Sequence, residues 1–557
     1  MKLFRPKLFD LKKGYRPADL VRDVVAGIIV AIIALPLSIA LAIASGVSPE
    51  QGLYTAIFAG FVIAAFGGSR VNISGPTAAF ATIVAGVVAT HGTAGLVTAT
   101  VLAGILLMLM GLCRLGGLIK YIPMTITTGF TAGIAVTIAI GQIKDFLGLT
   151  FAPGTHAVET TEKLSAIVAS ISTVSLHALI VGAVGLAVLI LWPMLGKARL
   201  GAFSRIAAKI PPSIIAVVVG ILLVELTPLE VNTVGTLYPT LSSRLPAPAL
   251  PDFSPATVTA VLPNALTIAL LAAIESLLSC VVSDGMIGDR HNSNTELMAQ
   301  GLGNVTSGLF GGIPATGAIA RTAANVKNGG RSPVSGMVHA VVLLLFLVLL
   351  MPLAKMIPMP IIAAILLMVA YNMSEWRHFV RICRFSAVAD ILVLVATFVL
   401  TVVFDLVVAI AAGLILSAFL FMKRMSDATR VRRWAKEDTR ANGRTLPDGV
   451  AVFEVNGPMF FAYADKLGDI APEEGIHTVI VRMGGVPSVD ATAVRSLSLL
   501  LATCRMRGIT LALSRVQDEP LAVLRKAGFI DALGEERVFA TIDDALAAVS
   551  ADAESPL

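Results

Sequence analysis

The feature that most constrains this chain is a series of long apolar stretches without a charged residue. No charge occurs between Asp23 and Glu50, and 43 residues without Asp, Glu, Lys or Arg separate Arg70 from Arg114. A helix of about 20 apolar residues crosses a bilayer, so the second stretch has room for two crossings. Further runs extend to residue 422, and together they predict about 14 membrane segments. We therefore expect an α-helical polytopic membrane protein.

Charge and composition argue against several classes of function. Charged residues make up 14% of the 557-residue chain and the mean hydropathy is +0.86, whereas an average soluble chain carries roughly 25% charged residues. A soluble enzyme and a nucleic-acid-binding protein are not expected. We attribute the net charge of +6 to Lys and Arg in residues 1–22 and just after residue 422. Because basic segments stay in the cytoplasm, both termini are predicted to be cytoplasmic, which requires an even number of crossings.

The composition changes after the last apolar run and divides the chain into four parts. Residues 1–22 form a cytoplasmic N-terminal segment, and residues 23–425 hold the membrane segments. Residues 426–447 are a charged linker, and residues 448–557 are typical of a small α/β domain. Within that domain the pattern predicts strands at 451–455, 478–482 and 509–514, and helices at 492–507, 519–527 and 542–550.

Two apolar segments are interrupted in a similar way. Ile73-Ser74-Gly75-Pro76-Thr77-Ala78 and Ile313-Pro314-Ala315-Thr316-Gly317-Ala318 each contain Pro, Gly and Thr. Thr77 lies 41 residues after Pro36, and Thr316 lies 41 residues after Glu275. This matched spacing indicates a repeat, with halves near 20–228 and 256–425. Seven segments in each half would give the two halves opposite orientations, as in many transporters.

The interrupted segments are suited to bind an anion. A break inside the bilayer exposes backbone N–H groups, which are tolerated where they line a cavity. Two helices that begin at the midplane would direct their positive ends at one place, and such ends bind anions. The alternative is that these are ordinary packing glycines and kinks, because small residues are common where membrane helices touch.

Two ionisable residues lie at membrane depth. Glu275 is the only charge between Asp252 and Asp284. A buried carboxyl binds protons readily, which suits a proton-coupling site, and Ser279 lies one helical turn further on the same face. The alternative is a structural Glu. Arg321 follows the second interrupted segment and supplies positive charge near the anion, unless it extends to the membrane interface.

Motifs for other chemistry are absent from the sequence. Cys113, Cys280, Cys383 and Cys504 form no C-x-x-C pair, and no spacing of His, Cys, Asp and Glu predicts a metal site. Neither a Walker motif nor G-x-S-x-G occurs. We expect no enzyme activity, no cofactor and no metal.

Taken together, these features resemble the sulfate permease (SulP) family of anion transporters over about residues 15–550. The similarity rests on Gly52-Leu53-Tyr54-Thr55, Gly67-Gly68-Ser69-Arg70, Ser74-Gly75-Pro76-Thr77-Ala78, Ile274-Glu275-Ser276-Leu277-Leu278-Ser279 and Gly301-Leu302-Gly303-Asn304. The C-terminal domain resembles the STAS domain of that family. Asp490 is followed by Ala491, so the phosphorylatable Ser of the related anti-sigma-factor antagonists is absent. A cytoplasmic protein partner of this domain remains open, against a role in folding or dimer support.

The resemblance implies a fold, an assembly and a site. The fold is a seven-plus-seven inverted repeat, with a core domain of segments 1–4 and 8–11 and a gate domain of the others. The family works as homodimers, and its core is thought to move as an elevator. The anion would lie between the interrupted helices, at Thr77, Ala78, Gly317, Ala318 and Ile319, with Arg321 nearby. Glu275 and Ser279 replace the Asp and Thr of sodium-coupled relatives, which favours protons over sodium.

Within the family, the motifs are most similar to bacterial C4-dicarboxylate transporters. They include Lys144-Asp145-Phe146-Leu147-Gly148-Leu149, the Asp284–Glu296 segment, Ala320-Arg321-Thr322-Ala323-Ala324-Asn325-Val326, Leu367-Met368-Val369-Ala370 and Tyr371-Asn372-Met373-Ser374-Glu375. The expected function is therefore secondary active, proton-coupled uptake of succinate, fumarate or aspartate across a bacterial inner membrane. One alternative is a sulfate or bicarbonate transporter that uses sodium. Another is a membrane-anchored sensor that signals through its STAS domain.

Overall fold

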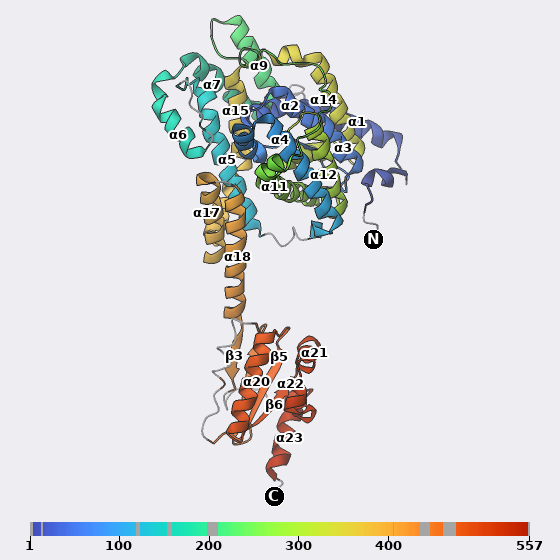
Figure 1. Cartoon of the computed structure of the whole chain (residues 1–557), viewed down its shortest axis with the longest axis vertical. Helices are drawn as coiled ribbons and strands as arrows, with labels where there is room; N and C mark the ends of the chain where they lie inside the picture. Colours follow the sequence, from blue (N-terminus) through green and yellow to red (C-terminus); the bar gives the residue numbers. More distant parts are fainter. Residues whose placement is uncertain are drawn as a thin grey trace. The chain divides into compact units, whose positions relative to one another are not determined.

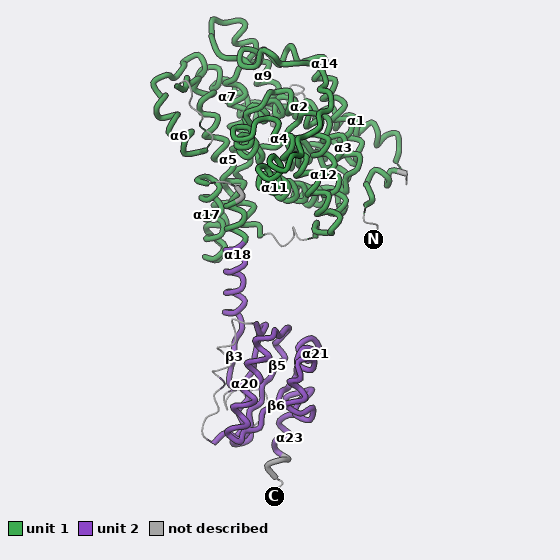
Figure 2. Tube along the Cα trace, viewed as in Figure 1, with its two compact units in different colours: residues 1–414 green, residues 415–557 purple. Residues whose placement is uncertain are grey.

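The computed structural model describes most of the chain. The residues outside the description are 1–3, 13–14, 118–122, 153–156, 158, 198–209, 405, 435–445, 461–469, 471–474 and 555–557. The chain divides into two compact units, residues 1–414 and 415–557 (Figure 2). Each unit is described by itself.

The first unit is built from apolar helices. In the described part of the chain, eight helices are long and apolar enough to cross a membrane. Seven of them are α1 (Pro17–Ala44), α4 (Ala81–Leu112), α5 (Met124–Leu147), α7 (Leu176–Lys197), α11 (Pro255–Ile287), α14 (Pro333–Ala354) and α15 with α16 (Met359–Phe385). The eighth, α18 (Leu406–Ala428), begins in the first unit and ends in the second. Two shorter apolar helices are α9 (Pro212–Leu226) and α17 (Val388–Val403).

Short and broken helices complete two matching series. A kink at Gly92, where φ is 67°, divides α4 into two segments. The pieces α2 (Pro49–Tyr54), η2 (Thr55–Ala59) and α3 (Gly60–Phe66) follow one another directly. The second half adds α12 (Ser293–Leu309) and α13 (Ile319–Lys327). The order α1, α2–α3, both parts of α4, α5, α7 and α9 then matches α11, α12, α13, α14, α15, α17 and α18, in agreement with the expected two series of seven.

The membrane helices pack into two groups. In one group, α4 packs against α11 and α12, and α1 packs against α14 (Figure 1). In the other group, α5 packs against α15 and α17, and α7 packs against α15 and α9. The first group contains segments 1–4 and 8–11 of the expected core, and the second contains segments of the expected gate.

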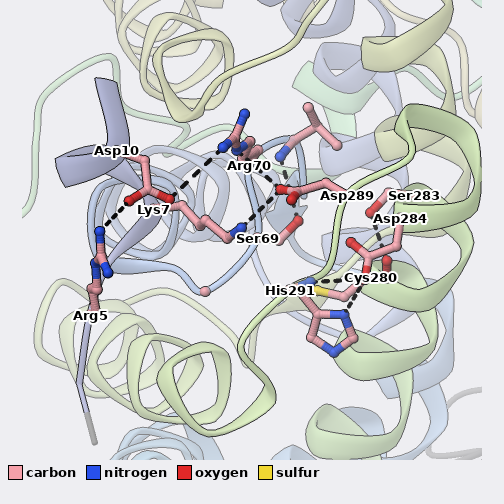
Figure 3. Close-up of polar contacts among 12 residues, drawn as sticks. Arg5, Lys7, Asp10, Ser69, Arg70, Cys280, Ser283, Asp284, Asp289 and His291 are labelled. Atoms are coloured by element: carbon pink, nitrogen blue, oxygen red, sulfur yellow. Dashed lines mark hydrogen bonds and ion pairs between the residues drawn. The ribbon is translucent and has the colours of Figure 1, made fainter. Parts of the chain in front are cut away.

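The N-terminal segment is bound to the first group by ion pairs (Figure 3). The short helix η1 (Lys7–Lys12) begins at Lys7, whose N–H donates to Gly67 O at 2.9 Å. Asp289, just after α11, accepts from Lys7 Nζ at 2.9 Å and from Arg70 Nε at 3.0 Å. Lys7, one of the basic residues from which a cytoplasmic N-terminus is predicted, therefore also holds the segment in place, together with Arg70.

The second unit contains a five-stranded sheet in the order β3-β4-β5-β6-β7. Only β3 is antiparallel to its neighbour. The strands are β3 (Arg430–Arg433), β4 (Val450–Asn456), β5 (Thr478–Gly485), β6 (Thr510–Ser514) and β7 (Val538–Phe539). The helices in the described part of this unit after β5 are α20 (Ala491–Met506), α21 (Asp518–Lys526), α22 (Phe529–Leu533) and α23 (Ile542–Glu554).

Alternation along the strands gives this sheet two apolar faces. Phe453 packs with α20, α21 and α22, whereas Val452 packs with α23. The three predicted strands and three predicted helices are all present. The interval 426–447 differs from a simple linker, because it holds the end of α18 and all of β3, which pairs with β4. Three of the four residues of β3 are Arg, which does not resemble the pattern of a strand with a buried face.

Candidate functional site

The two interrupted segments meet as a pair of short strands. β1 (Ser74–Gly75) pairs antiparallel with β2 (Thr316–Gly317), so that Ser74 faces Gly317 and Gly75 faces Thr316. The N–H of Ala318 extends the pair by donating to Ile73 O at 2.8 Å. The pairing satisfies backbone groups that would otherwise be exposed inside the membrane. We call this place the junction.

A helix leaves the junction on each side. Thr77 precedes η3 (Ala78–Phe80), which leads into α4, and Ala318 precedes α13. No side chain caps either helix start, so their first N–H groups remain available to a ligand. Not every expected donor is available, because the N–H of Gly317 donates to Ser276 Oγ at 3.0 Å and that of Ala318 donates to Ile73. Ala78 and Ile319 lie at the two helix starts.

Glu275 lies beside the first helix start. Its Oε2 accepts a hydrogen bond from Thr77 Oγ1 at 3.1 Å, and the residue is partly buried. The expected neighbour Ser279 does not join it. Ser279 Oγ instead donates to Asn72 Oδ1 at 2.7 Å and lies 3.2 Å from Thr322 Oγ1. Ser279 therefore lies on the same helix as Glu275 but shares none of its hydrogen-bond partners.

Arg321 faces the junction rather than the membrane interface. It lies in the first turn of α13, is 2% exposed and donates from Nη2 to Pro76 O. Its Nε and Nη1 have no partner in the described part of the chain. A buried guanidinium with open donors is suited to an oxyanion, because such donors are costly to leave unpaired. The interface alternative for Arg321 is not observed.

A buried acid that could not be predicted from the sequence holds the residues next to the junction in place by hydrogen bonds. Glu296, in the first turn of α12, is fully buried. Its Oε2 accepts from the N–H groups of Gly68 and Ser69 at 2.9 and 3.1 Å. Its Oε1 accepts from Asn72 Nδ2 at 2.8 Å and Gln300 Nε2 at 3.0 Å. The only signal in the sequence is an acid in the first turn of a helix. Such an acid usually just interacts favourably with the positive end of the helix dipole.

Asn72 connects this acid to both halves of the molecule. Its Oδ1 accepts from Ser279 and from Thr322 Oγ1, the latter at 3.0 Å. Thr322 in turn accepts from the N–H of Ile73 at 2.9 Å. On the other strand, Ser276 Oγ lies 2.8 Å from Thr316 Oγ1. These contacts fix both strands against α11, so that the helix starts keep their positions.

The described residues contain no group of three or more His, Cys, Asp or Glu side chains that could hold a metal ion. The chemistry of the junction is instead that of two helix starts, one buried cation and one carboxyl. This set can bind an anion by backbone N–H groups and a guanidinium, and it can hold a proton on Glu275.

Comparison with known proteins gives relatives for both units. Residues 20–397 match the sulfate permease family, and residues 445–545 match the STAS domain. YvdB of Bacillus subtilis (strain 168), a candidate sulfate transporter, is 38% identical over 95% of this chain and 97% of its own length. The bicarbonate transporter BicA of Picosynechococcus sp. is 31% identical over 89% of this chain and 85% of BicA.

Solved structures agree with these relatives. The transmembrane domain of a cyanobacterial BicA has a TM-score of 0.61 at 30% identity, covering 71% of this chain and 98% of that domain. The murine anion transporter Slc26a9 in its inward-facing state has a TM-score of 0.88 at 18% identity, covering 98% and 94%, which is a likeness of fold alone. The names of these proteins refer to sulfate, bicarbonate or anions in general, so the expected dicarboxylate subfamily is not supported.

Proposed function

The chain belongs to the sulfate permease family of anion transporters, and from this premise we propose that it is a secondary active transporter of sulfate, with bicarbonate as the second candidate. The 38% identity to a candidate sulfate transporter supports the first cargo, and the 31% identity to BicA supports the second. Both replace the expected dicarboxylate. The family indicates a transporter rather than an enzyme.

One observation carries the proposal: two uncapped helix starts and the open donors of Arg321 converge on one place. Helix starts carry partial positive charge, and a guanidinium pairs well with the oxygens of a tetrahedral or planar oxyanion. The first N–H groups at Ala78 and Ile319 would hold the anion, with Arg321 beside it. Thr77, Gly317 and Ala318 would shape the site.

Glu275 would couple transport to protons. Its carboxyl contacts Thr77, which immediately precedes the anion-binding helix start. Ionised, it would repel an arriving anion, whereas protonated it would not. A proton and an anion would then occupy the site together, and each would favour the binding of the other. Ser279 would act indirectly, by fixing Asn72, and we assign it no coupling ion.

Membership of the family is also the basis of a proposal for the assembly and the orientation of the protein in the membrane. We propose a homodimer in a bacterial inner membrane, with both termini in the cytoplasm and with the first helix group moving against the second as an elevator. Most of the helix packing lies within each group, although α1 also contacts α9 and α15, and this supports such a movement. The STAS domain would bind a cytoplasmic partner. A sensor without transport is disfavoured, because the open donors at the junction would then have no ligand.

The test is uptake into proteoliposomes with an acid exterior, with radiolabelled sulfate, bicarbonate and succinate supplied separately, with and without sodium. We expect proton-driven sulfate uptake without sodium, and loss of the response to the proton gradient in Glu275→Gln. Glu225→Gln is the matched control, because Glu225 is an exposed acid near the end of α9.

Each other outcome changes a defined part of the proposal. Sodium-dependent bicarbonate uptake would replace both cargo and coupling ion but leave the anion site. Succinate uptake without sulfate uptake would restore the dicarboxylate prediction. No uptake of any of the three anions would contradict the proposed cargoes. A Glu275→Gln variant that still follows the proton gradient would remove Glu275 from coupling.

A further inference from the structure

A cavity lies in the membrane unit, away from the junction. It has a volume of about 410 Å³ and is lined by parts of α1, α4, α5 and the short helix α6 (Thr160–Ala169). Figure 1 shows α6 beside α5, and the two helices pack together. The lining includes Ile43 and Ala44 at the end of α1. A helix of that length spans about 42 Å, so the cavity lies near the membrane face opposite to the start of α1.

The lining of this cavity carries positive charge only. It includes Lys144 from α5 and Lys163 from α6, and it includes no acid. Lys144 Nζ lies 4.9 Å from the centre of the Phe151 ring. Lys163 Nζ lies 4.0 Å from the point where a Cβ on Gly141 would stand. Both ammonium groups therefore reach the same part of the α5–α6 surface.

Neither lysine has an ion-pair partner among the described residues. Residues 153–156 and 158, which lie outside the description, include no Asp or Glu in the sequence. Asp145 follows Lys144 along α5 but does not line the cavity. Glu162 Oε2 accepts a hydrogen bond from the N–H of Glu159 at 3.1 Å. Burial lowers the pKa of Lys163, and the charge of Glu162 opposes this shift, so the ammonium is partly removed from water.

We propose that this cavity is an outer anion-binding site, in which Lys144 and Lys163 hold a small oxyanion such as sulfate before it reaches the junction. Ala85 lines the cavity and follows Ala78 by seven residues, a rise of about 10 Å along the helix. The volume lies within the roughly 300–1,000 Å³ of small-molecule pockets. The role as an entry site rests on the proposed transport function, whereas anion binding in the cavity does not.

The first test measures binding without transport. The variant Gly141→Cys is reacted with a negatively charged, membrane-impermeant methanethiosulfonate reagent added outside cells, with the parent chain giving the background of its own cysteines. We expect labelling that sulfate slows at least threefold more than chloride at equal ionic strength. In Gly141→Cys with Lys163→Gln, this difference should disappear.

Three results of that test would overturn the site. They are no labelling of the introduced thiol, equal protection by sulfate and chloride, and sulfate protection that persists without Lys163. Protection that depends on anionic lipid and not on soluble sulfate would assign the lysines to a lipid headgroup and would also overturn the proposal.

The second test measures entry. The double variant Lys144→Gln/Lys163→Gln should raise the KM for external sulfate about tenfold at low salt, with little change in the maximal rate, since a charged cleft raises the local anion concentration by about 10-fold or more. Lys355→Gln is the matched control, because Lys355 follows α14 and does not line the cavity. An unchanged KM in the double variant would overturn the entry role. Absence of sulfate uptake in the wild type would contradict the proposed function instead, and the labelling test would still decide on binding.

Discussion

At the scale of residues, the two acids near the junction have opposite surroundings. Glu296 is fully buried and accepts four hydrogen bonds, two of them from backbone N–H groups. Among the described residues, Glu275 accepts one, from Thr77. A carboxylate with all its acceptor sites used is a structural element, whereas one with a single partner can gain and lose a proton at small structural cost.

We therefore predict that Glu296→Gln destabilises the protein and Glu275→Gln does not. The amide NH₂ group introduced by Glu296→Gln would face two donors, and each hydrogen bond to a charged acceptor contributes about 1.5–3 kcal/mol. The melting temperature in detergent, read by intrinsic fluorescence, should fall clearly for Glu296→Gln only. Equal melting temperatures for Glu296→Gln and the wild type would show that the carboxylate is not needed.

The residues at the junction could be predicted from the sequence, but the residues that hydrogen-bond to its strands could not. Thr77, Glu275 and Arg321 could be predicted because interrupted helices and membrane-depth charges are rare and visible in one chain. The Asn72–Glu296 contact joins residues 224 positions apart, and no local pattern reports such a pairing. The hydrogen-bond partners of Ser279, Asn72 and Thr322, could not be predicted for the same reason.

At the scale of elements, α4 and α12 approach closely through glycines. A Cβ on Gly301 would lie 2.5 Å from Gly104 O, and a Cβ on Gly104 would lie 2.6 Å from Gly301 O. Small residues allow such contacts between membrane helices. Because α12 carries Glu296, this contact also fixes the distance between the junction and its support.

Gly301→Ala should therefore reduce folding, since an added methyl meets backbone that cannot move without displacing a helix, at a cost of about 1–3 kcal/mol or more. The matched control is Gly86→Ala, which makes the same change on α4 at a position with nothing within 4 Å. The yield of monodisperse protein on gel filtration measures the effect. A similar yield for both variants would contradict the close approach.

The N-terminal helix η1 should detach at acid pH. Burial raises the pKa of Asp289, but the hydrogen bond from Lys7 and the charges of Lys7 and Arg70 outweigh it and hold that pKa below its usual value. The stabilisation that the ionised Asp289 gives to η1 is present above the usual carboxyl pKa of about 3.9. It is lost as the pH falls through the lowered pKa.

A spin label at Phe9→Cys, in a background with Cys113→Ser, would report this change as increased mobility below about pH 4. The variant Asp289→Asn should show the mobile spectrum already at pH 7, while Asp252→Asn, far along the chain on the other side of α11, should not. High salt should also increase the mobility of the label in the wild type, because salt screens ion pairs. A spectrum independent of both pH and Asp289 would contradict the ion pairs.

At the scale of the whole molecule, the boundary of the C-terminal unit depends on one strand. β3 pairs with β4 over four residues, and Trp434, just after it, is buried against the face that contains Val452. We predict that residues 429–557 form a more stable fragment than residues 446–557. The melting temperature by circular dichroism should be about 5–15 °C lower for the shorter fragment, because 1 kcal/mol shifts it by roughly 4–8 °C in a small domain. Equal stability would show that β3 is dispensable.

The general architecture could be predicted from the sequence, whereas this boundary could not. The difference lies in the strength of the periodic pattern that each element leaves in the sequence. Apolar runs and alternating strands are strong periodic signals, so the segments, the repeat and the α/β domain follow from the sequence. β3 reads Arg430-Val431-Arg432-Arg433 and lies at the edge of the sheet, where charged residues are common. An edge strand of this composition looks like a linker until its partner is known.

The pairing of β1 with β2 also has a consequence for biosynthesis. Gly75 and its partner Thr316 are 241 positions apart in the chain. At about 5–20 residues per second, a ribosome needs roughly 10 to 50 s to add the second strand after the first. During that interval the first strand resides in the translocation machinery or the bilayer without its hydrogen-bond partner. In a nascent chain that stops before Thr316, the backbone groups of the first strand therefore stay unpaired inside the membrane. We expect such a chain to be degraded by quality-control proteases.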